Sequence, residues 1–421
     1  MDSIKRENIG KSIVFNTISD KRFKTMKLSV SFILPLKSST VAKFALLPGL
    51  LTRTSQDYPD FTQFSKKLSM LYGANLTGNV RKMGDNQVIT LSISGIDDRY
   101  AFEGDKISES MSKLLCDVIF RPKLNGNSFC DEEISQEKRQ LKDLIDSEFN
   151  EKRIYANNRF TEIMCKNEPF GISRLGTKDN VDKVTGEELY DAWKIMLSES
   201  NVEIFFIGES SSDSAKNIFT YRFSAHNRTP YKIENTVVPY NGELKEETEV
   251  MELAQSKMIM GFRTDIAVPS VDVMAMRVAI ALLGSTSHSK LFNNVREKLS
   301  LCYYCAARYN RIKGIVTIES GVERENIEKA RDAILNEINE MINGNITDFE
   351  VEATKLSMCN DFIAVCDYDS GLENWYLSQI MDGDFNSVEE VCQAVNAVTK
   401  QQIIKVIKTL VFDTIYVLES K

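Results

Sequence analysis

The sequence contains very little histidine: only His226 and His288 occur among its 421 residues. Neither of them has a second histidine at the spacing that would place both on one face of a helix. A catalytic zinc site is usually built around histidine nitrogen, with further nitrogen, sulfur or oxygen ligands. The sequence therefore excludes a histidine-rich zinc site formed by this chain alone.

Long apolar runs and basic blocks are also missing. No segment approaches the roughly 20 apolar residues that a membrane helix needs, and the first seven residues lack the apolar core of a signal peptide. The formal net charge is -8, and no cluster of lysine and arginine stands out to neutralise phosphates. We therefore expect a cytoplasmic protein that binds neither membrane nor nucleic acid.

The short motifs of several other enzyme classes are absent. GxSxG, GxxxxGK[ST] and GxGxxG do not occur, so nucleophile-elbow and phosphate-loop chemistries have no support. The eight cysteines of a long cytoplasmic chain are interpreted as reduced thiols. Cys302 and Cys305 form a CxxC without a second CxxC, and a strand would point them to opposite faces, so we predict no metal there.

An internal repeat of about 200 residues organises the sequence that is present. Each half ends with a helix opened by a capping box and followed by a short apolar strand. Thr185 opens the first of these helices, and Thr399, 214 positions later, opens the second. Amphipathic helices at 107–118 and 327–341 repeat in the same way. The repeat predicts an α+β protein made of two homologous domains.

A polar stretch with two prolines separates the two halves and is typical of a linker. We predict an N-terminal domain over residues 1–225, a linker over residues 226–246, and a C-terminal domain over residues 247–421. At 421 residues the chain is too long for one ordinary core, which agrees with two domains.

Several short segments, in this order and spacing, resemble the M16 family, the peptidases of the insulinase and mitochondrial processing-peptidase group. The segments are Arg22–Thr25, Leu71–Ala74 and Leu291–Lys298. Each is weak alone, but the duplicated plan makes the set specific. The resemblance implies two α/β-sandwich domains, each an antiparallel-rich sheet with packed helices, and it is closest to bacterial members that lack the zinc motif.

Active members of this family carry HxxEH on their first helix, and the comparable stretch here departs from that motif at every functional position. Ala45 and Gly49 stand where the two histidines would be, and Pro48 stands where the general-base glutamate would be. None of the three offers a side-chain donor to zinc. The family's third ligand is a glutamate on a later helix, and the similar segment places Leu144 there, with Asp143 as the alternative match. We expect no zinc on this chain and no hydrolysis by it alone.

The second half retains a different piece of the family pattern. The family has an arginine and a tyrosine in Arg-Glu-x-x-Gly-Leu-x-Tyr, and here Arg296 and Tyr303 stand at those positions, with Ser300 in place of glycine. The resemblance implies that they hold the substrate backbone and the developing oxyanion, for which fixed guanidinium and phenol donors are suited. Tyr304 is an adjacent alternative on the opposite face of a strand. A solvated helix end and a half-buried strand aromatic remain the plain structural interpretation.

The resemblance implies a non-catalytic, peptide-binding subunit of a heterodimeric zinc peptidase. Zinc is then held by an HxxEH-bearing M16 partner, and Arg296 and Tyr303 act on that site in trans. Peptides or unfolded proteins are the implied substrates. A homodimer, and a non-proteolytic M16-fold scaffold or peptide-binding protein, stay open as alternatives.

Overall fold

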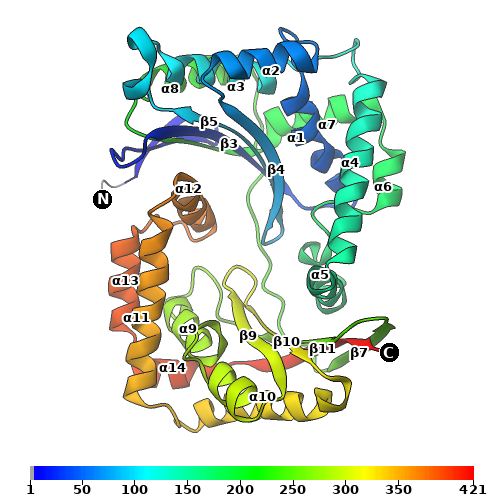
Figure 1. Ribbon diagram of the computed structural model, residues 1–421, viewed down its shortest axis with the longest axis vertical. Coiled ribbons are helices and arrows are strands. Elements are labelled where there is room, and N and C mark those ends of the chain that lie inside the picture. Colours follow the sequence, from blue (N-terminus) through cyan, green and yellow to red (C-terminus); the bar gives the residue numbers. More distant parts are fainter. Residues whose placement is uncertain (1–3) are drawn as a thin grey trace. The chain divides into compact units, whose positions relative to one another are not determined.

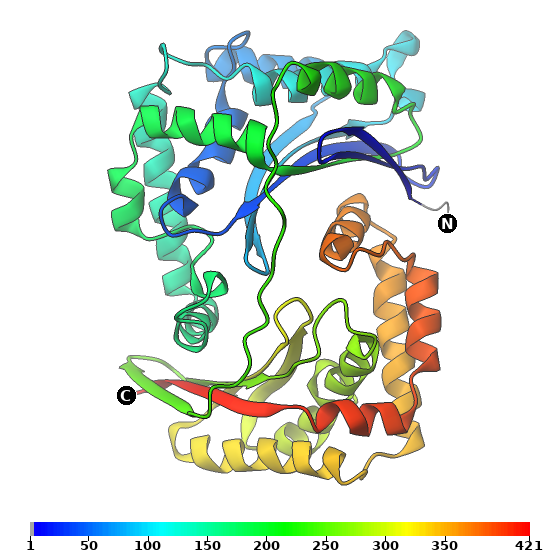
Figure 2. The ribbon, with the colours of Figure 1, turned by 180° about the vertical axis from the view of Figure 1, so that it is seen from behind.

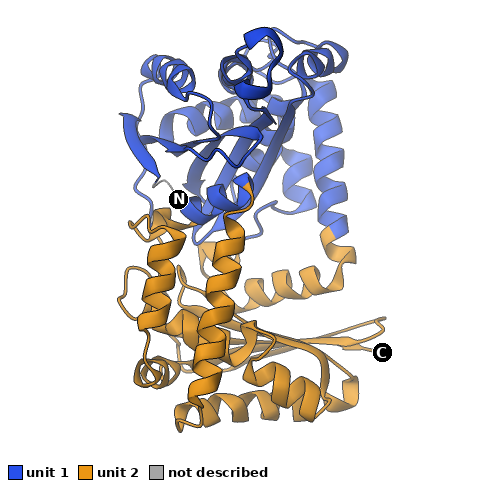
Figure 3. Ribbon diagram, turned by 60° about the vertical axis from the view of Figure 1, so that its left-hand side comes forward, with its two compact units in different colours: residues 1–147, 172–234, 369–377 blue, residues 148–171, 235–368, 378–421 orange. Residues whose placement is uncertain are grey.

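The computed structural model describes residues 4–421, so the first three residues of the N-terminal segment considered above lie outside it. Contacts divide the chain into two compact units (Figure 3). Unit 1 contains the chain up to Ser147 together with residues 172–234 and 369–377. Unit 2 contains residues 148–171, 235–368 and 378–421.

In the described part of the chain, unit 1 is built on a six-stranded sheet with the order β1-β2-β6-β3-β5-β4 (Figure 1). The strands are β1 Lys5–Gly10, β2 Ile13–Ile18, β3 Thr25–Pro35, β4 Asn75–Met83, β5 Asn86–Ile96 and β6 Asn201–Ile207. Strands β2 and β6 pair in parallel, and the other neighbours are antiparallel. The helices of this unit, in sequence order, are α1 Val41–Arg53, α2 Phe61–Met70, α3 Ile107–Phe120, α4 Asp131–Asn150, α6 Lys178–Lys183, α7 Gly186–Glu199 and α8 Asp213–Ser224.

The side chains of β3 point alternately to the two faces of this sheet. Leu28, Val30 and Phe32 belong to the large apolar core that also contains side chains of α1, α3 and α7. The intervening residues Ser29 and Ser31 point to the opposite face, because successive strand side chains alternate. Alternate residues of β3 therefore face the helices.

Unit 2 repeats this plan within the described residues, with a five-stranded sheet in the order β7-β11-β8-β10-β9. The strands are β7 Lys245–Met251, β8 Ser256–Arg263, β9 Cys302–Asn310, β10 Ile315–Val322 and β11 Val411–Ser420. Its α-helices are α5 Lys152–Met164, α9 Val273–Ile280, α10 Ile327–Ile342, α11 Asp348–Val365, α13 Val388–Ala397 and α14 Lys400–Ile407. An irregular helix, η5, spans Leu291–Lys298 and leads into β9.

The two sheets confirm the predicted repeat. In each, the last strand of the half lies inside the sheet, parallel to one neighbour and antiparallel to the other: β6 lies between β2 and β3, and β11 lies between β7 and β8. Thr185 and Thr399 both form complete capping boxes, at the starts of α7 and α14. The fold is therefore α+β with two related halves, as the sequence predicts.

Two helices lie in one half of the sequence but belong to the compact unit that is formed mainly by the other half (Figure 3). Helix α5 packs on the sheet of unit 2, where a Cβ atom on Gly261 would lie 2.4 Å from Phe160 Cζ. Residues 369–377 of α12, which spans Asp369–Ser378, belong to unit 1. There the buried Glu373 accepts a hydrogen bond of 2.7 Å from Ser29 Oγ and pairs with Lys27 at 2.6 Å. Each compact unit therefore consists of segments that are not continuous in the sequence.

The stretch predicted as a linker has neither helix nor strand from residue 227 to residue 244, and Figure 2 shows it as an extended chain. Contacts hold it near its start and in its middle. Arg228 is 4% exposed and donates to the carbonyl oxygens of Leu197 and Ser200, and the carbonyl of Thr236 accepts from Lys313. The Arg228 side chain thereby satisfies two carbonyl groups at the end of α7, and the Lys313 side chain satisfies one carbonyl group of the extended stretch.

Candidate functional site

The altered zinc motif lies on α1, where the helix packs on the edge strand β4. Pro48 is buried inside the helix and lacks the N–H that would bond to the preceding turn. A Cβ atom on Gly78 of β4 would lie 2.7 Å from Pro48 Cβ and 2.9 Å from Pro48 O. Gly78 therefore lets the strand approach the helix at the position where active relatives carry their general base.

A carboxylate from α4 fills the space beside Gly49. Glu137 is 6% exposed and accepts a 2.7 Å hydrogen bond from Arg53 Nε at the end of α1. A Cβ atom on Gly49 would lie only 1.9 Å from Glu137 Oε2. No side chain fits at position 49 while this ion pair is in place, so an imidazole there is excluded.

Sequence reasoning missed the Arg53–Glu137 pair. The available signal was Gly49 itself, since a glycine inside a helix costs about 0.5–1 kcal/mol relative to alanine. Such a residue is retained where a neighbouring group approaches the backbone closely.

The predicted third-ligand position is exposed. Leu144 is 45% exposed, and the alternative match, Asp143, is also exposed. Leu144 lies two turns of α4 beyond Glu137, which corresponds to about 10 Å along the helix axis. Among residues 4–421, no group of three or more His, Cys, Asp or Glu side chains could hold a metal ion. That this chain binds no zinc stays a prediction.

The structure brings Arg296 and Tyr303 together. Both line one open pocket of about 450 Å³ in unit 2, which Glu323 also lines. The Arg296 guanidinium lies 4.7 Å from the Phe292 ring, and its Nε is 3.5 Å from the carboxylate of the exposed Glu297. A pairing of that length between exposed groups is weak, so the guanidinium stays available to a ligand.

A left-handed residue and a bulge produce this arrangement. Ser300 has φ +50°, so the position where relatives carry glycine keeps a conformation that favours glycine. The chain reverses there, and β9 begins two residues later. In β9, Cys302 pairs with Val322 and Tyr304 with Gly321, which leaves Tyr303 as the extra residue of a β-bulge. Bulges re-aim side chains next to functional sites.

The phenol of Tyr303 is a poised donor. Its ring is 64% exposed, and a hydrogen bond to the Glu323 carboxylate raises the pKa of the hydroxyl above its ordinary value. A phenol is already protonated at neutral pH at its ordinary pKa of about 10, and the shift is upward, so the hydroxyl can donate a hydrogen bond. This is the protonation state that stabilisation of an oxyanion requires.

Tyr304 points to the other face of the sheet, as the alternation predicts. Its ring lies 4.6 Å from the Arg153 guanidinium of α5, and burial raises the pKa of its hydroxyl to about 12. Tyr304 is therefore a packing residue beside α5 and does not line the Arg296 pocket.

The bulge also corrects the prediction for the CxxC. Cys302 and Cys305 were expected on opposite faces, but both are buried in the same apolar core, and a hydrogen bond joins their thiols. The extra residue in β9 shifts the alternation by one position, which brings the two side chains to one face.

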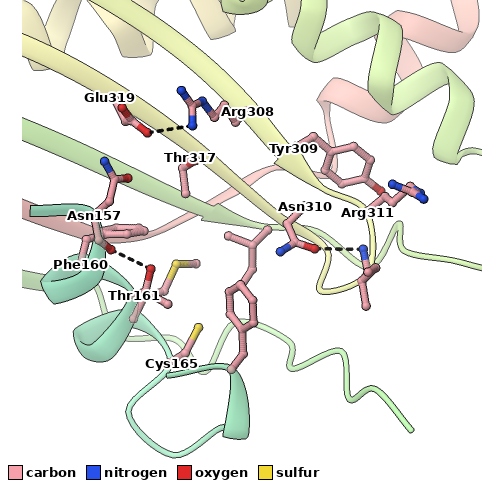
Figure 4. Close-up of a pocket in the computed structure, with 14 residues that line it drawn as sticks. Asn157, Phe160, Thr161, Cys165, Arg308, Tyr309, Asn310, Arg311, Thr317 and Glu319 are labelled. Carbon is pink, nitrogen blue, oxygen red and sulfur yellow. Dashed lines mark hydrogen bonds and ion pairs between the residues drawn. The ribbon is translucent and has the colours of Figure 1, made fainter. Parts of the chain in front are cut away.

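A second pocket, of about 400 Å³, lies between α5 and the β9–β10 hairpin (Figure 4). Its apolar part is formed by side chains such as Phe160 and Ile315. At its rim the exposed Arg308 lies 3.8 Å from the buried carboxylate of Glu319, which Arg153 also pairs with, at 2.9 Å. The pocket therefore combines an apolar floor with polar and charged residues.

Comparisons with known proteins identify relatives of this chain. The family model described as the peptidase M16 inactive domain matches residues 183–358. The chain is 31% identical over 403 residues to the probable inactive metalloprotease YmfF of Bacillus subtilis (strain 168), covering 96% of this chain and 95% of that protein.

Solved structures extend the likeness over the whole fold. A conserved protein from Enterococcus faecalis V583 superposes with a TM-score of 0.91 at 28% identity, covering 100% of this chain and 99% of that one. A structure described as a peptidase M16 inactive domain from Pseudomonas fluorescens superposes with a TM-score of 0.78 at 14% identity, covering 100% and 98%.

Within residues 4–421, every helix is too short or too polar to cross a membrane. The zinc motif is replaced on α1. The sequence matches a protein described as a probable inactive metalloprotease over 96% of this chain, and the fold matches a structure described as a peptidase M16 inactive domain over 100% of it. This chain belongs to the M16 peptidase family.

Proposed function

We propose that this chain is the non-catalytic, peptide-binding subunit of a cytoplasmic, heterodimeric M16 zinc peptidase. In this complex it supplies Arg296 and Tyr303 to the HxxEH zinc site of its partner. The observation that carries the proposal is the pocket in which these two side chains converge, one cationic and one a protonated phenol.

The chemistry follows from the two donors. When zinc-bound water attacks a peptide carbonyl, negative charge develops on the carbonyl oxygen, and preorganised donors stabilise it. Arg296 offers several N–H groups in a fixed plane. The Tyr303 side chain is exposed and forms a hydrogen bond with Glu323 at the pocket wall. Its hydroxyl can therefore rotate away from Glu323 and donate to a substrate oxygen. Loss of one such donor costs about 10²–10³ in kcat.

The first half of the chain supports a role without hydrolysis. Gly49 and Pro48 stand where a ligand and the general base of the family would be, and the Glu137 carboxylate, paired with Arg53, fills the space beside Gly49. The chain therefore keeps the M16 framework with its donor pocket, and zinc would be bound by the partner alone.

The test is peptide cleavage by the HxxEH-bearing M16 protein of the same organism, measured alone and mixed with this chain. We expect hydrolysis of a fluorogenic peptide only in the mixture. Arg296→Ala and Tyr303→Phe should each lower it by about 10²–10³-fold without weakening the complex, whose formation is followed by analytical size exclusion.

Matched controls are available in the same unit. Arg331→Ala removes a partly exposed arginine from α10, and Tyr304→Phe removes the neighbouring phenol on the other face. Both should leave cleavage unchanged. If the zinc protein is equally active alone, the shared-site proposal fails. If the complex is required but Arg296 and Tyr303 are not, the chain is an M16-fold scaffold.

A further inference from the structure

Two thiols stand on either side of the candidate donor Tyr303. Cys302 precedes it, Cys305 follows it by two positions, and both are free thiols. The bulge in β9 places both sulfur atoms in the buried core of unit 2, where a hydrogen bond joins them. The exposed phenol is therefore held between two thiols that lie in contact with each other.

The separation of the two backbone positions suits a disulfide. Cys302 lies opposite Val322 and Cys305 lies opposite Ser320, which is two residues away on β10. Two residues of a strand span about 6.4–6.8 Å, and the Cα atoms of a disulfide are usually about 4.4–6.8 Å apart. The pair lies at the upper end of this range, so a disulfide can form there if the bulge contracts slightly.

The two thiols differ in reactivity. The hydrogen bond from Cys305 lowers the pKa of Cys302 against the effect of burial, and the positive charge of Arg296 adds to this lowering. The same hydrogen bond raises the pKa of Cys305. Because the thiolate is the nucleophile, Cys302 is the attacking sulfur and Cys305 is the resolving one.

A small oxidant can reach Cys302. This residue is only 8% exposed, but it lines the open pocket of about 450 Å³ that Arg296 and Tyr303 also line. Cys305 is 6% exposed and does not line that pocket. Oxidation of a thiol follows its thiolate character and its access, and both favour Cys302 as the first to react.

We propose that Cys302 and Cys305 form a peroxide-sensitive thiol pair whose oxidation to a disulfide displaces Tyr303 from the pocket. The Cys302 thiolate attacks one oxygen of hydrogen peroxide, the O–O bond breaks, and a sulfenic acid forms while the other oxygen leaves as water. The Cys305 sulfur then attacks the Cys302 sulfur, the S–S bond forms, and the S–O bond breaks with release of a second water. The pair loses two electrons and two protons, and one hydrogen peroxide becomes two water molecules.

The disulfide acts on the phenol through the backbone. A covalent bond holds two sulfur atoms closer than a hydrogen bond does, so it draws Cys302 and Cys305 together and changes the bulge between them. A bulge sets the direction of its extra side chain, so Tyr303 turns away from Glu323. Loss of cleavage through this step rests on the proposed function, whereas the disulfide and the movement of Tyr303 do not.

The first measurements use the full chain without a partner. The wild-type chain is treated with hydrogen peroxide, and its disulfides are mapped by mass spectrometry of the peptides. We expect a disulfide between Cys302 and Cys305 that dithiothreitol reverses. The NMR signal of ring-labelled Tyr303 should shift on oxidation and return on reduction. In Cys305→Ala the resolving thiol is absent, so dimedone, which labels sulfenic acids, should label Cys302.

A matched pair of thiols lies in the same unit, between α11 and α13. Cys359 Sγ donates to the carbonyl oxygen of Cys392 at 3.9 Å, and burial raises the pKa of the Cys392 thiol to about 12. A thiol with such a pKa supplies little thiolate, so this pair should be oxidised more slowly. Cys359→Ala should therefore respond to peroxide as the wild-type chain does. Far-UV circular dichroism of each variant shows whether the fold is retained.

Cleavage by the complex with the zinc-bearing partner is measured last. The oxidised chain should support cleavage about 100-fold more slowly than the reduced chain, because a donor displaced by about 1 Å loses that much. The inference is overturned if peroxide oxidises Cys359 and Cys392 before Cys302 and Cys305, or if the disulfide forms without a shift of the Tyr303 signal. If the signal shifts but cleavage by the reduced complex does not depend on Tyr303, the proposed function fails and the thiol pair stands.

Discussion

Replacing Gly49 with alanine should destabilise the chain, although alanine is the better helix former. The new Cβ atom would lie 1.9 Å from Glu137 Oε2, far inside van der Waals contact, so the carboxylate must leave its position. The side chains of Arg53 and Glu137 are only 17% and 8% exposed, so the ion pair that is disturbed is largely buried. Breaking a buried pair costs about 3–5 kcal/mol when one partner is removed, and a displaced partner should cost somewhat less.

The helix preference of alanine offsets about 1 kcal/mol of this cost. We therefore expect the variant to lose about 1–3 kcal/mol of unfolding free energy. In a Glu137→Ala background the obstructing carboxylate is gone, and the same Gly49→Ala change should instead be neutral or stabilising by up to about 1 kcal/mol.

Urea unfolding of the full chain, followed by far-UV circular dichroism, measures both arms of this cycle. The reversal of sign between the two backgrounds is the specific prediction. If Gly49→Ala changes the unfolding free energy equally with and without Glu137, the Glu137 carboxylate does not occupy the space beside position 49.

Three further predictions concern the donor pocket and the frame of unit 1. Ser300→Val should cost about 1–2 kcal/mol in the same urea experiment, because a β-branched residue at φ +50° is strained, whereas Ser300→Gly should be tolerated. Glu323→Gln should lower the pKa of Tyr303, which NMR of ring-labelled tyrosine measures; an unchanged pKa would disprove the hydrogen bond. Burial opposes ionisation of Asp97, but hydrogen bonds from Arg99 and Ser210 outweigh it and lower its pKa below the usual 3.8. Asp97→Asn should therefore cost about 1–3 kcal/mol at neutral pH. Because a lowered pKa gives stability that is present above the unfolded-state value and lost as the pH falls, the gap should shrink below about pH 4, and a constant gap would contradict this.

Local sequence patterns predicted much of the fold. The capping boxes at Thr185 and Thr399 and the apolar strands after them depend on neighbouring residues, and both appear where they were expected. The exchange of α5 and α12 was not predictable in this way. It rests on contacts between distant positions, such as Glu373 with Ser29, which lie 344 residues apart in the sequence.

The candidate site was also predictable only where local sequence patterns determine it. The family pattern brought Arg296 and Tyr303 to notice, and they do line one pocket. The bulge that aims Tyr303 was not foreseen, because it depends on the register against Gly321 and Val322 of another strand. Glu137 beside Gly49 was missed because packing between two helices, rather than a motif, places it there.

The most direct test of the central proposal is the turnover number of the zinc-bearing partner when it is saturated with this chain, either wild type or Tyr303→Phe. Phenylalanine keeps the ring and removes the hydroxyl that would meet the oxyanion. The proposal predicts that kcat falls about 100-fold or more, with KM and complex formation little changed. An unchanged kcat would contradict a donor role in trans and would leave this chain as a structural partner.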